Sequence, residues 1–323
     1  MRHSVPIRWS AVPVASCVLL AGLTAGAQTL AAARSEARAG RVDAAEAATK
    51  AVLAADKSNA EAHSLLCSLY SSIELRDEAV TECEAAAALA PNNSSYALDL
   101  ARAYGSKADH GGMLTGMRLV SKIRGGFERA VSLDGRNVDA LSDLGEFYVD
   151  APGVAGGGTD KAKALVPRLA QVSAVRAHRL RGMIYAKDKT DSAALEEYNA
   201  ALAATHEPEA YVDLAIFYKS RKQMEKAAEN AKLAIQQDKK HGPDTLDAAA
   251  ILIDLKTDPT VVQTALRAYL ASPQSGVARY AKAHVLLGTS LQVSGDSAGA
   301  QREFSAAQAL ASRYEAARKA SHG

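Results

Sequence analysis

One stretch of 34 residues, from Ala60 to Asn93, constrains the fold more than any other part of the chain. It reads AEAHSLLCSLYSSIELRDEAVTECEAAAALAPNN and contains two helical patterns separated by a short turn. Small residues stand at its positions 8, 20 and 27, where they allow two helices to approach closely. Because such a hairpin cannot bury its apolar face alone, the stretch predicts an array of similar hairpins that cover one another.

Copies of this pattern recur along the chain at spacings of 32 to 44 residues. Position 20 is small or aliphatic in eight copies, at Ala45, Ala79, Ile123, Ala162, Ala194, Ala227, Ala265 and Ala300. Position 11 is a tyrosine in five successive copies, at Tyr70, Tyr104, Tyr148, Tyr185 and Tyr218. We therefore predict about eight helix pairs over residues 28–323, clearest at residues 60–93, 208–241 and 281–314.

The positions of the small residues, the tyrosine and the proline resemble the tetratricopeptide repeat (TPR), here as Cys67, Ala79, Ala86, Tyr70 and Pro91. The resemblance covers nearly all of residues 28–314. It implies an all-α fold, a right-handed superhelical solenoid of about eight helix pairs whose first helices line a concave face. It also implies a protein that binds other proteins, and it names no reaction.

The two ends of the array depart from the pattern. The first copy keeps only the second-helix pattern around Ala45, as is usual for a terminal repeat. The sequence SRYEAARKASHG after Ala311 is polar enough to cap the last helix. We therefore expect a terminal repeat at one end of the array and a helix cap at the other.

Residues 1–27 have the features of a secretory signal peptide. Arg2 and Arg8 precede an apolar run, and the segment ends in Ala25-Gly26-Ala27, a small-x-small cleavage pattern. The run is shorter than the roughly 20 residues that a membrane-spanning helix needs. We expect export to a Gram-negative periplasm, with secretion, or a lipid anchor on Cys17 after Val14-Ala15-Ser16, as alternatives. The mature chain should have no transmembrane segment.

The charge of the remaining chain excludes one class of partner. Residues 1–27 contain two of the 38 basic residues and no acidic residue, so 36 basic and 36 acidic residues remain. A net charge of zero lacks the basic surface that nucleic acid or anionic lipid requires. The expected partner is therefore a protein or peptide, and no nucleic acid.

Two copies carry extra residues between their helices. Residues 105–122 exceed the usual length and contain Gly111-Gly112, after which Met113–Leu133 is expected to form a lengthened second helix. Residues 150–159, DAPGVAGGGT, are five residues longer than usual. Insertions of this kind fall on one face of a solenoid, often the binding face.

The 34-residue stretch also contains the two cysteines that remain after export, Cys67 and Cys83. They fall on the two facing helices of one pair. Two alternatives stay open: a disulfide, which an exported protein can keep, or two small buried thiols that fill core positions.

Other candidate sites have simpler explanations. The Gly-rich loop at 153–159 lacks the lysine and the preceding strand of a phosphate loop, so we expect a turn with Thr159 as N-cap. His63, His178 and His284 share position 4 but belong to separate copies, too far apart for one zinc ion. No nucleophile–base motif occurs. We therefore predict a protein that is not an enzyme and has no metal and no cofactor.

The concave face is the remaining candidate site. The resemblance places a mixed set of side chains there, which we predict to bind the partner: Ser68, Arg102, Glu146, Arg179, Met183, Ile216 and Lys219. The prediction is a protein-interaction scaffold of the cell envelope. The alternatives are a self-assembling or structural subunit of an envelope assembly machine, or an accessory domain of an enzyme complex.

Overall fold

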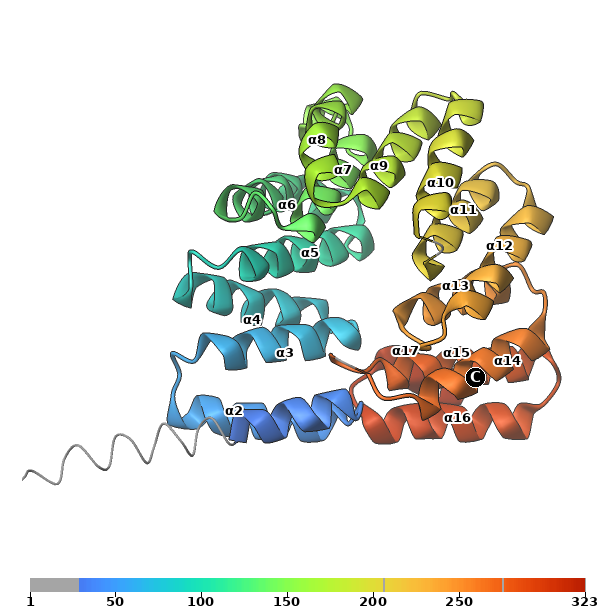
Figure 1. The fold of residues 1–323 in the computed structure, drawn as a ribbon. Coiled ribbons are helices and arrows are strands. Elements are labelled where there is room, and N and C mark those ends of the chain that lie inside the picture. Colours follow the sequence, from blue (N-terminus) through green and yellow to red (C-terminus); the bar gives the residue numbers. More distant parts are fainter. Residues whose placement is uncertain (1–28, 206, 275, 323) are drawn as a thin grey trace, which may run out of the picture.

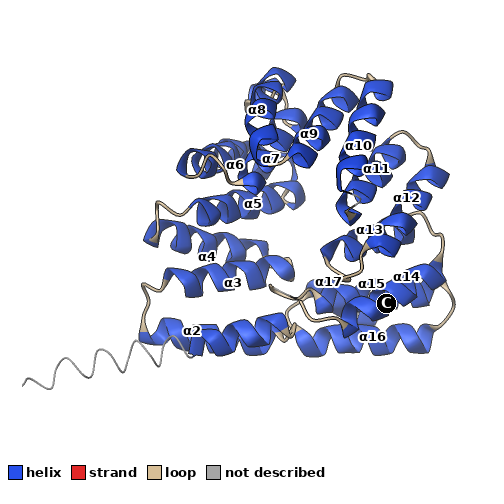
Figure 2. Cartoon of the chain, in the orientation of Figure 1, coloured by secondary structure: helices blue, strands red, loops and turns tan. Residues whose placement is uncertain are grey.

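The chain folds into a ring of paired α-helices, and the computed structural model describes residues 29–205, 207–274 and 276–322 (Figure 1). Figure 2 shows helices and connecting loops, and these ranges contain no strand. Residues 29–38 are helical. The elements that follow are α2 (Val42–Ala55), α3 (Ala60–Ser72), α4 (Arg76–Leu89), α5 (Ser94–His110), α6 (Gly112–Leu133), α7 (Val138–Asp150), the 3-10 helix η1 (Gly153–Ala155), α8 (Thr159–Val172), α9 (Ala174–Lys187), α10 (Asp191–Thr205), α11 (Pro208–Ser220), α12 (Met224–Gln237), α13 (Pro243–Asp254), α14 (Pro259–Ala271), α15 (Tyr280–Val293), α16 (Ser297–Leu310) and α17 (Glu315–His322).

The helices form two layers. Residues 29–38 precede α2, and each odd-numbered helix from α3 to α15 packs against the helix that follows it, so the described residues contain eight pairs and α17. The first helices of successive pairs contact one another and form the inner layer of the ring (Figure 1). The all-α solenoid of about eight pairs, predicted from the repeat, is confirmed.

Recurring polar residues start the inner helices. The side chain of Asn59 accepts a hydrogen bond of 3.0 Å from the backbone N–H of Ala62 at the start of α3. Asn93 and Asn137 cap α5 and α7 in the same way. These caps satisfy N–H groups that the first turn of a helix leaves without partners, so a repeating asparagine sets where inner helices begin.

The recurring spacing of small residues and tyrosines along the chain has a packing cause. A Cβ on Gly182 would lie 2.9 Å from the Tyr198 ring, and one on Gly288 would lie 2.4 Å from the Phe304 ring. The tyrosine at position 11 reaches back to the preceding pair, since Tyr148 on α7 donates a 2.9 Å hydrogen bond to Glu128 on α6. Small residues thus join the helices within a pair, and tyrosines join successive pairs.

The first described helices lie against the last ones, which closes the ring (Figure 1). We call this junction the seam; residues 29–46 form one side and residues 277–317 the other. The N–H of Ala278 donates to the carbonyl of Ala37 over 2.9 Å, and the N–H of Ser312 donates to the carboxylate of Asp43 over 3.0 Å. One buried apolar cluster includes residues from both sides: Leu30, Ala33, Ala37, Val42, Ala45, Ala281, Ala307, Ala311, Tyr314 and Ala317.

Arg313 adds polar contacts across the seam. Its guanidinium pairs with Glu78 on α4, lies 3.5 Å from a carboxylate oxygen of Glu46 on α2, and stacks over the Tyr70 ring at 5.6 Å. The Tyr70 hydroxyl in turn donates a 3.0 Å hydrogen bond to Glu46. The last repeat is therefore attached to the first by both apolar and charged groups.

The ends of the array differ from the sequence-based expectation. Helical residues 29–38 supply the first helix that the repeat pattern did not reveal. The residues after Ala311 were expected to cap the last helix, and α17 does pack against α15 and α16; beyond that expectation, Tyr314 and Ala317 are buried, at 3% and 0% exposure. The physical reason is the seam, because each end covers the apolar surface that the other would leave open.

Two other features complete the description. The predicted signal peptide, residues 1–27, and the alternative lipid anchor at Cys17 lie outside the described residues. In the described ranges, no helix combines the length and the apolar character that crossing a membrane requires.

Candidate functional site

The two insertions build opposite walls of one cleft. The first insertion lengthens α5 to 17 residues and α6 to 22 residues, whereas α3 and α4 of the reference repeat have 13 and 14. The second insertion forms η1 and the loop between α7 and α8. Between these elements lies a cleft of about 910 Å³, lined by residues of α5, α6, α7 and the inserted loop. We call it the insertion cleft.

Residues 105–122 were expected to form an inserted turn, and most of them are helical. Residues up to His110 continue α5, and α6 begins at Gly112. The chain reverses at Gly111 and at Gly112, whose φ of 73° lies in the left-handed region that favours glycine. The insertion thus projects as a helical hairpin, and α6 includes the lengthened helix predicted at Met113–Leu133.

Hydrogen bonds to backbone carbonyl groups hold the inserted loop in place. Gly158 donates a 2.7 Å hydrogen bond to the carbonyl of Tyr148, and the Lys161 ammonium donates one of 2.7 Å to the carbonyl of Gly156. A Cβ on Gly157 would lie 1.8 Å from the carbonyl oxygen of Ala151, so the close approach requires glycine. Thr159 is not the N-cap that we expected; it is the first residue of α8, and Gly158 holds the cap position without a side-chain hydrogen bond.

Large apolar side chains are uncovered around this cleft. Met113 and Met117 on α6 are 80% and 67% exposed, and Val154 in η1 is fully exposed. All three line the cleft, and Leu114, 67% exposed, lies beside them on α6. The other exposed large apolar residues lie on four different helices, at Leu89, Ile216, Met224 and Val293. A contiguous exposed apolar surface marks a binding site, whereas single scattered apolar residues do not.

The charges of the cleft are mostly negative. Its lining contains one basic residue, Arg102, and four acidic ones, Asp109, Asp143, Glu146 and Asp150. Arg102 pairs with Asp143 at 2.6 Å. Burial, reinforced by the neighbouring carboxylate of Glu146, raises the pKa of Asp150 above its ordinary value. The cleft therefore combines an apolar wall with four carboxylates, of which Asp109 and Asp150 make no ion pair within 4 Å among the described residues, although Lys187 and Arg179 act on Asp150 from a greater distance.

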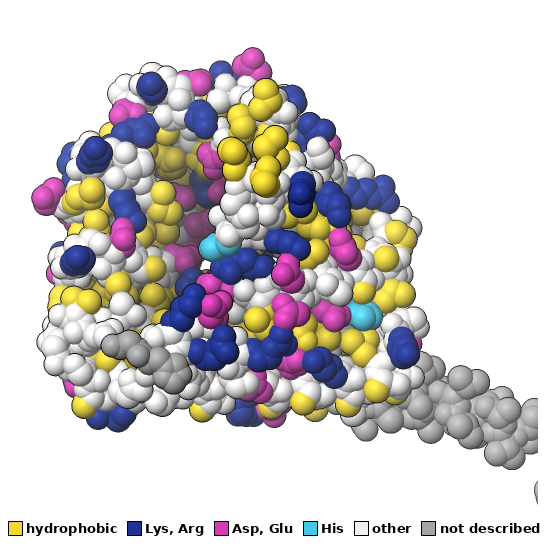
Figure 3. Space-filling model, turned by 180° about the vertical axis from the view of Figure 1, so that it is seen from behind, with side chains coloured by type: hydrophobic (Ala, Val, Ile, Leu, Met, Phe, Trp, Pro, Cys, Tyr) yellow, Lys and Arg dark blue, Asp and Glu magenta, His cyan; other side chains and the backbone are white. Residues whose placement is uncertain are grey.

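Beyond the cleft, ion pairs connect the inner helices from one to the next. Arg179 on α9 pairs with Glu146 on α7 at 3.0 Å and with Asp213 on α11 at 2.9 Å. Lys219 on α11 pairs with Asp254 on α13 at 2.5 Å. Figure 3 shows basic and acidic side chains intermingled over one face of the molecule, in line with the zero net charge inferred from the sequence.

The predicted partner-binding residues therefore divide into groups. Arg102, Glu146, Arg179 and Lys219 are engaged in ion pairs between inner helices. The hydroxyl of Ser68 donates to the carbonyl of Ser64 over 3.1 Å, and Met183 packs against the core. Ile216 is 53% exposed. Of the whole set, only Arg102 and Glu146 line the insertion cleft.

Sequence reasoning missed the residues that make the cleft apolar, namely Met113, Met117 and Val154. The available signal was the position of all three in or beside the two insertions, next to glycines. Nothing in the repeat pattern showed that the insertions meet, because they belong to different repeats.

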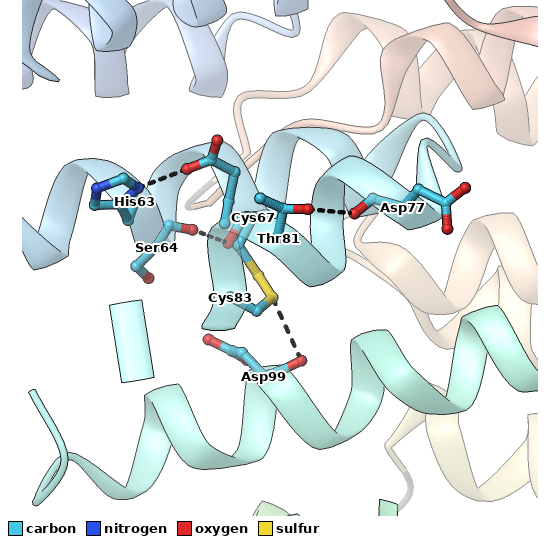
Figure 4. Close-up of a disulfide and its surroundings, with 9 residues drawn as sticks. His63, Ser64, Cys67, Asp77, Thr81, Cys83 and Asp99 are labelled. Carbon is cyan, nitrogen blue, oxygen red and sulfur yellow. Dashed lines mark hydrogen bonds and ion pairs between the residues drawn. A yellow bond between two sulfur atoms is a disulfide. The ribbon is translucent and has the colours of Figure 1, made fainter. Parts of the chain in front are cut away.

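The two cysteines form a disulfide between α3 and α4 (Figure 4). The Cα atoms of Cys67 and Cys83 are 5.1 Å apart, and both side chains are buried. The Cys83 sulfur lies 3.7 Å from the carbonyl oxygen of Asp99 on α5. Of the two alternatives left open by the sequence, the structure has the bridge.

The three position-4 histidines each pair with a glutamate of their own repeat. The His63–Glu82, His178–Glu197 and His284–Glu303 pairs all have Nδ1–Oε2 distances of 2.6 Å (His63 in Figure 4). Each pair joins the two helices of one repeat. Among the described residues, no group of three or more His, Cys, Asp or Glu side chains is arranged to hold a metal ion.

Comparison with known proteins yields structural matches alone. No protein-family model and no curated protein matches the chain. The structure of yeast Tom70 matches with 14% identity and a TM-score of 0.52, over 86% of this chain and 58% of Tom70. A thermophilic TPR protein of Thermus thermophilus matches over 72% of this chain and 98% of its own length, with 19% identity and a TM-score of 0.43. MamA matches over 50% of this chain and 87% of its own, with 22% identity and a TM-score of 0.40.

Proposed function

Because the chain has the fold of tetratricopeptide-repeat proteins, we propose that it is a non-enzymatic protein-interaction scaffold of the cell envelope. In this proposal, a segment of a partner protein binds on the inner side of the ring, with its apolar side chains in the insertion cleft. Arg102 and Glu146, predicted from the sequence to bind the partner, form the polar part of the same site.

The observation that carries the proposal is the uncovered apolar wall of the cleft. Met113 and Met117 are 80% and 67% exposed, and leaving such large apolar side chains in water is unfavourable unless a partner covers them. Methionine side chains are flexible and polarisable, and they adapt to differently shaped apolar partners. A helical hairpin that holds two methionines toward a cleft is thus suited to receive another protein.

The side chains that line the cleft are suited to binding and form no recognisable catalytic arrangement. Its titratable groups are carboxylates and one arginine, and the arginine is already paired with Asp143. The lining contains two serines, Ser106 and Ser121, but no histidine or lysine that could activate a serine as a nucleophile. Binding is the function that this set of side chains supports.

Two features support the envelope location. Residues 1–27 have the sequence features of a signal peptide, and the Cys67–Cys83 bridge belongs to a class of bond that persists in oxidising compartments. Cell fractionation with intact-mass analysis tests this part. We expect a periplasmic chain that begins at residue 28 and contains the disulfide; a cytoplasmic chain that retains residues 1–27 would contradict it.

Site-specific photo-cross-linking in cells tests the binding site. A photoreactive residue at position 117 or 154 should cross-link one and the same protein, because both positions line the cleft. The matched control is Val293 on α15, which is 62% exposed but isolated. The cross-link should disappear when Met113 is also replaced by serine. Equal cross-linking from position 293, or no effect of Met113→Ser, would overturn the assignment of the site.

The alternative of a self-assembling subunit has its own outcome in this experiment. If the cross-linked protein is a second copy of this chain, the cleft is a self-association site and the scaffold proposal fails. Light scattering across a concentration series would then show a mass that grows with concentration.

A further inference from the structure

We infer that the insertion cleft binds a cationic amphipathic helix of the partner protein. The inference rests on the proposed function and adds the chemical class of the bound segment. It is carried by the charge of the cleft, by the form of its apolar wall, and by the hydrogen-bonding groups that it offers.

The charge of the cleft is complementary to a basic segment. Arg102 is neutralised by Asp143, and Glu146 is neutralised by Arg179 from α9. The carboxylates of Asp109 and Asp150 have no ion-pair partner within 4 Å among the described residues. They lie on α5 and α7, the two inner helices that flank the cleft. A partner with lysine or arginine side chains at the edge of its apolar face would pair with them.

The basic residues of α6 do not reverse this charge. None of them lines the cleft. Lys122 lies 3.6 Å from Glu84 on α4 and 4.8 Å from the centre of the Tyr104 ring, so it is directed to the other side of the helix. Arg124 lies 3.8 Å from Glu128 on the same helix. The Arg124 guanidinium also packs against Gly156 of the inserted loop, so it bridges α6 and that loop without being part of the cleft lining.

The apolar wall has the form that an amphipathic helix requires. Met113, Met117 and Val120 follow one another on one face of α6, and Phe127 lies deeper, at 8% exposure. Residues spaced by three and four form one stripe along a helix. A second helix laid along this stripe would place its own apolar stripe between α6 and the inserted loop. The volume of about 910 Å³ is enough for several large side chains.

A helix fits this site better than an extended peptide because of hydrogen bonding. An extended segment needs main-chain partners, which a sheet edge supplies in other binding modes. The described residues contain no strand, and the cleft is lined mainly by carbons and carboxylates. A helix satisfies its own backbone groups and requires only side-chain contacts from its receptor.

The experiment uses designed peptides of about 18 residues, longer than the roughly 12 to 15 residues below which isolated helices are marginal. The first peptide has leucine on one helical face and lysine on the other. The second keeps the leucines and replaces every lysine with glutamate. The third has the composition of the first in scrambled order. Fluorescence anisotropy measures the binding of each peptide to the oxidised full-length protein at two salt concentrations.

Two double variants and one control separate the contributions. Met113→Ser with Met117→Ser removes the apolar wall, and Asp109→Asn with Asp150→Asn removes the unpaired carboxylates. Met224→Ser with Val293→Ser replaces exposed apolar residues elsewhere in the ring. Circular dichroism establishes that each variant remains helical.

The inference predicts that the lysine peptide binds at least about tenfold more tightly than the glutamate and scrambled peptides. The methionine variant should lose about tenfold in affinity, the carboxylate variant about threefold to tenfold with a smaller salt dependence, and the control variant nothing.

Equal binding of the lysine and glutamate peptides, both weakened by the methionine variant, would overturn the cationic assignment and leave the cleft as a binding site. Equal binding of the scrambled peptide would overturn the helix. Binding that no cleft variant alters would overturn the proposed function as well.

Discussion

The seam and the insertion cleft differ in what covers their apolar side chains. At the seam, Leu30, Ala311 and Tyr314 are 5%, 0% and 3% exposed, because the two ends of the array cover each other. At the cleft, Met113, Met117 and Val154 are at least 67% exposed, and no described residue covers them. The two ends thus bury their apolar surface against each other, whereas the insertions leave a group of neighbouring apolar side chains uncovered; the other exposed large apolar residues of the described ranges are scattered over four helices. This contrast is the main reason to assign binding to the cleft.

The largest expected effect is on stability at the seam. Tyr314→Ala removes a side chain that is 3% exposed and should lower the free energy of unfolding by about 3–5 kcal/mol. The matched cleft variant, Leu114→Ala, removes a side chain that is 67% exposed and should change it by less than about 0.5 kcal/mol. Urea unfolding followed by circular dichroism compares the two. Similar losses for both variants would show that the contrast between seam and cleft is wrong.

The next effect concerns the disulfide beside the seam. Replacing Cys67 and Cys83 with alanine should cost about 2–4 kcal/mol, since the bridge closes a loop with a sequence separation of 16 residues. The native protein treated with reductant should lose a similar amount. If reductant leaves its unfolding curve unchanged, the bridge does not stabilise this end of the ring.

A smaller effect is expected from the charged contact of the seam. Arg313→Ala removes the pairs with Glu78 and Glu46 and the contact with the Tyr70 ring. Because the Arg313 side chain is 41% exposed, solvent screens these pairs, and we expect a loss of about 1 kcal/mol or less. Arg302→Ala on α16 is the control, since Arg302 has no ion-pair partner within the described ranges. If Arg313→Ala lowered the free energy of unfolding by several kcal/mol more than Arg302→Ala, charge and not apolar burial would hold the seam.

The smallest expected effect is the pH dependence of peptide binding at the cleft. The charged groups around Asp150 are Glu146, Lys187 and Arg179, with Arg102 and Asp109 across the cleft. Burial raises the pKa of Asp150, so its carboxylate becomes neutral at a higher pH than an exposed aspartate would. Affinity for the lysine peptide should therefore fall by about twofold to fivefold as the pH falls through this raised pKa. Asp150→Asn should remove that part of the pH profile; an unchanged profile would assign the dependence to another group.

The repeat pattern predicted the layers of the fold because each repeat obeys local rules. Cys67, Gly182 and Gly288 occupy a position where only a small residue fits beneath the facing helix, and that requirement is visible in the sequence. The same rules do not determine the curvature of the whole array. The contact between Ala37 and Ala278 depends on small rotations that add up over eight pairs, so the seam could not be predicted.

The candidate site was predictable in part, for a similar reason. The sequence showed two insertions, and it placed Arg102 and Glu146 on the inner face, where both line the cleft. It did not show that Arg179 and Lys219 would be engaged by neighbouring helices, because ion pairs between repeats depend on the rotation of each inner helix. Exposed residues such as Met113 also resemble core residues in the sequence, and burial alone distinguishes them.

The closed ring is the central claim, and a distance measurement across the seam tests it most directly. Spin labels at Arg38 and Arg279, which are exposed and follow the hydrogen-bonded residues Ala37 and Ala278, report the separation by electron–electron double resonance. The chain used begins at residue 28, with cysteines introduced at positions 38 and 279 for labelling, and the disulfide keeps Cys67 and Cys83 unreactive. The account predicts one narrow distribution at the short distance of adjacent helices, unchanged by the lysine peptide. A broad or long-distance distribution, as in an open superhelix, would contradict it.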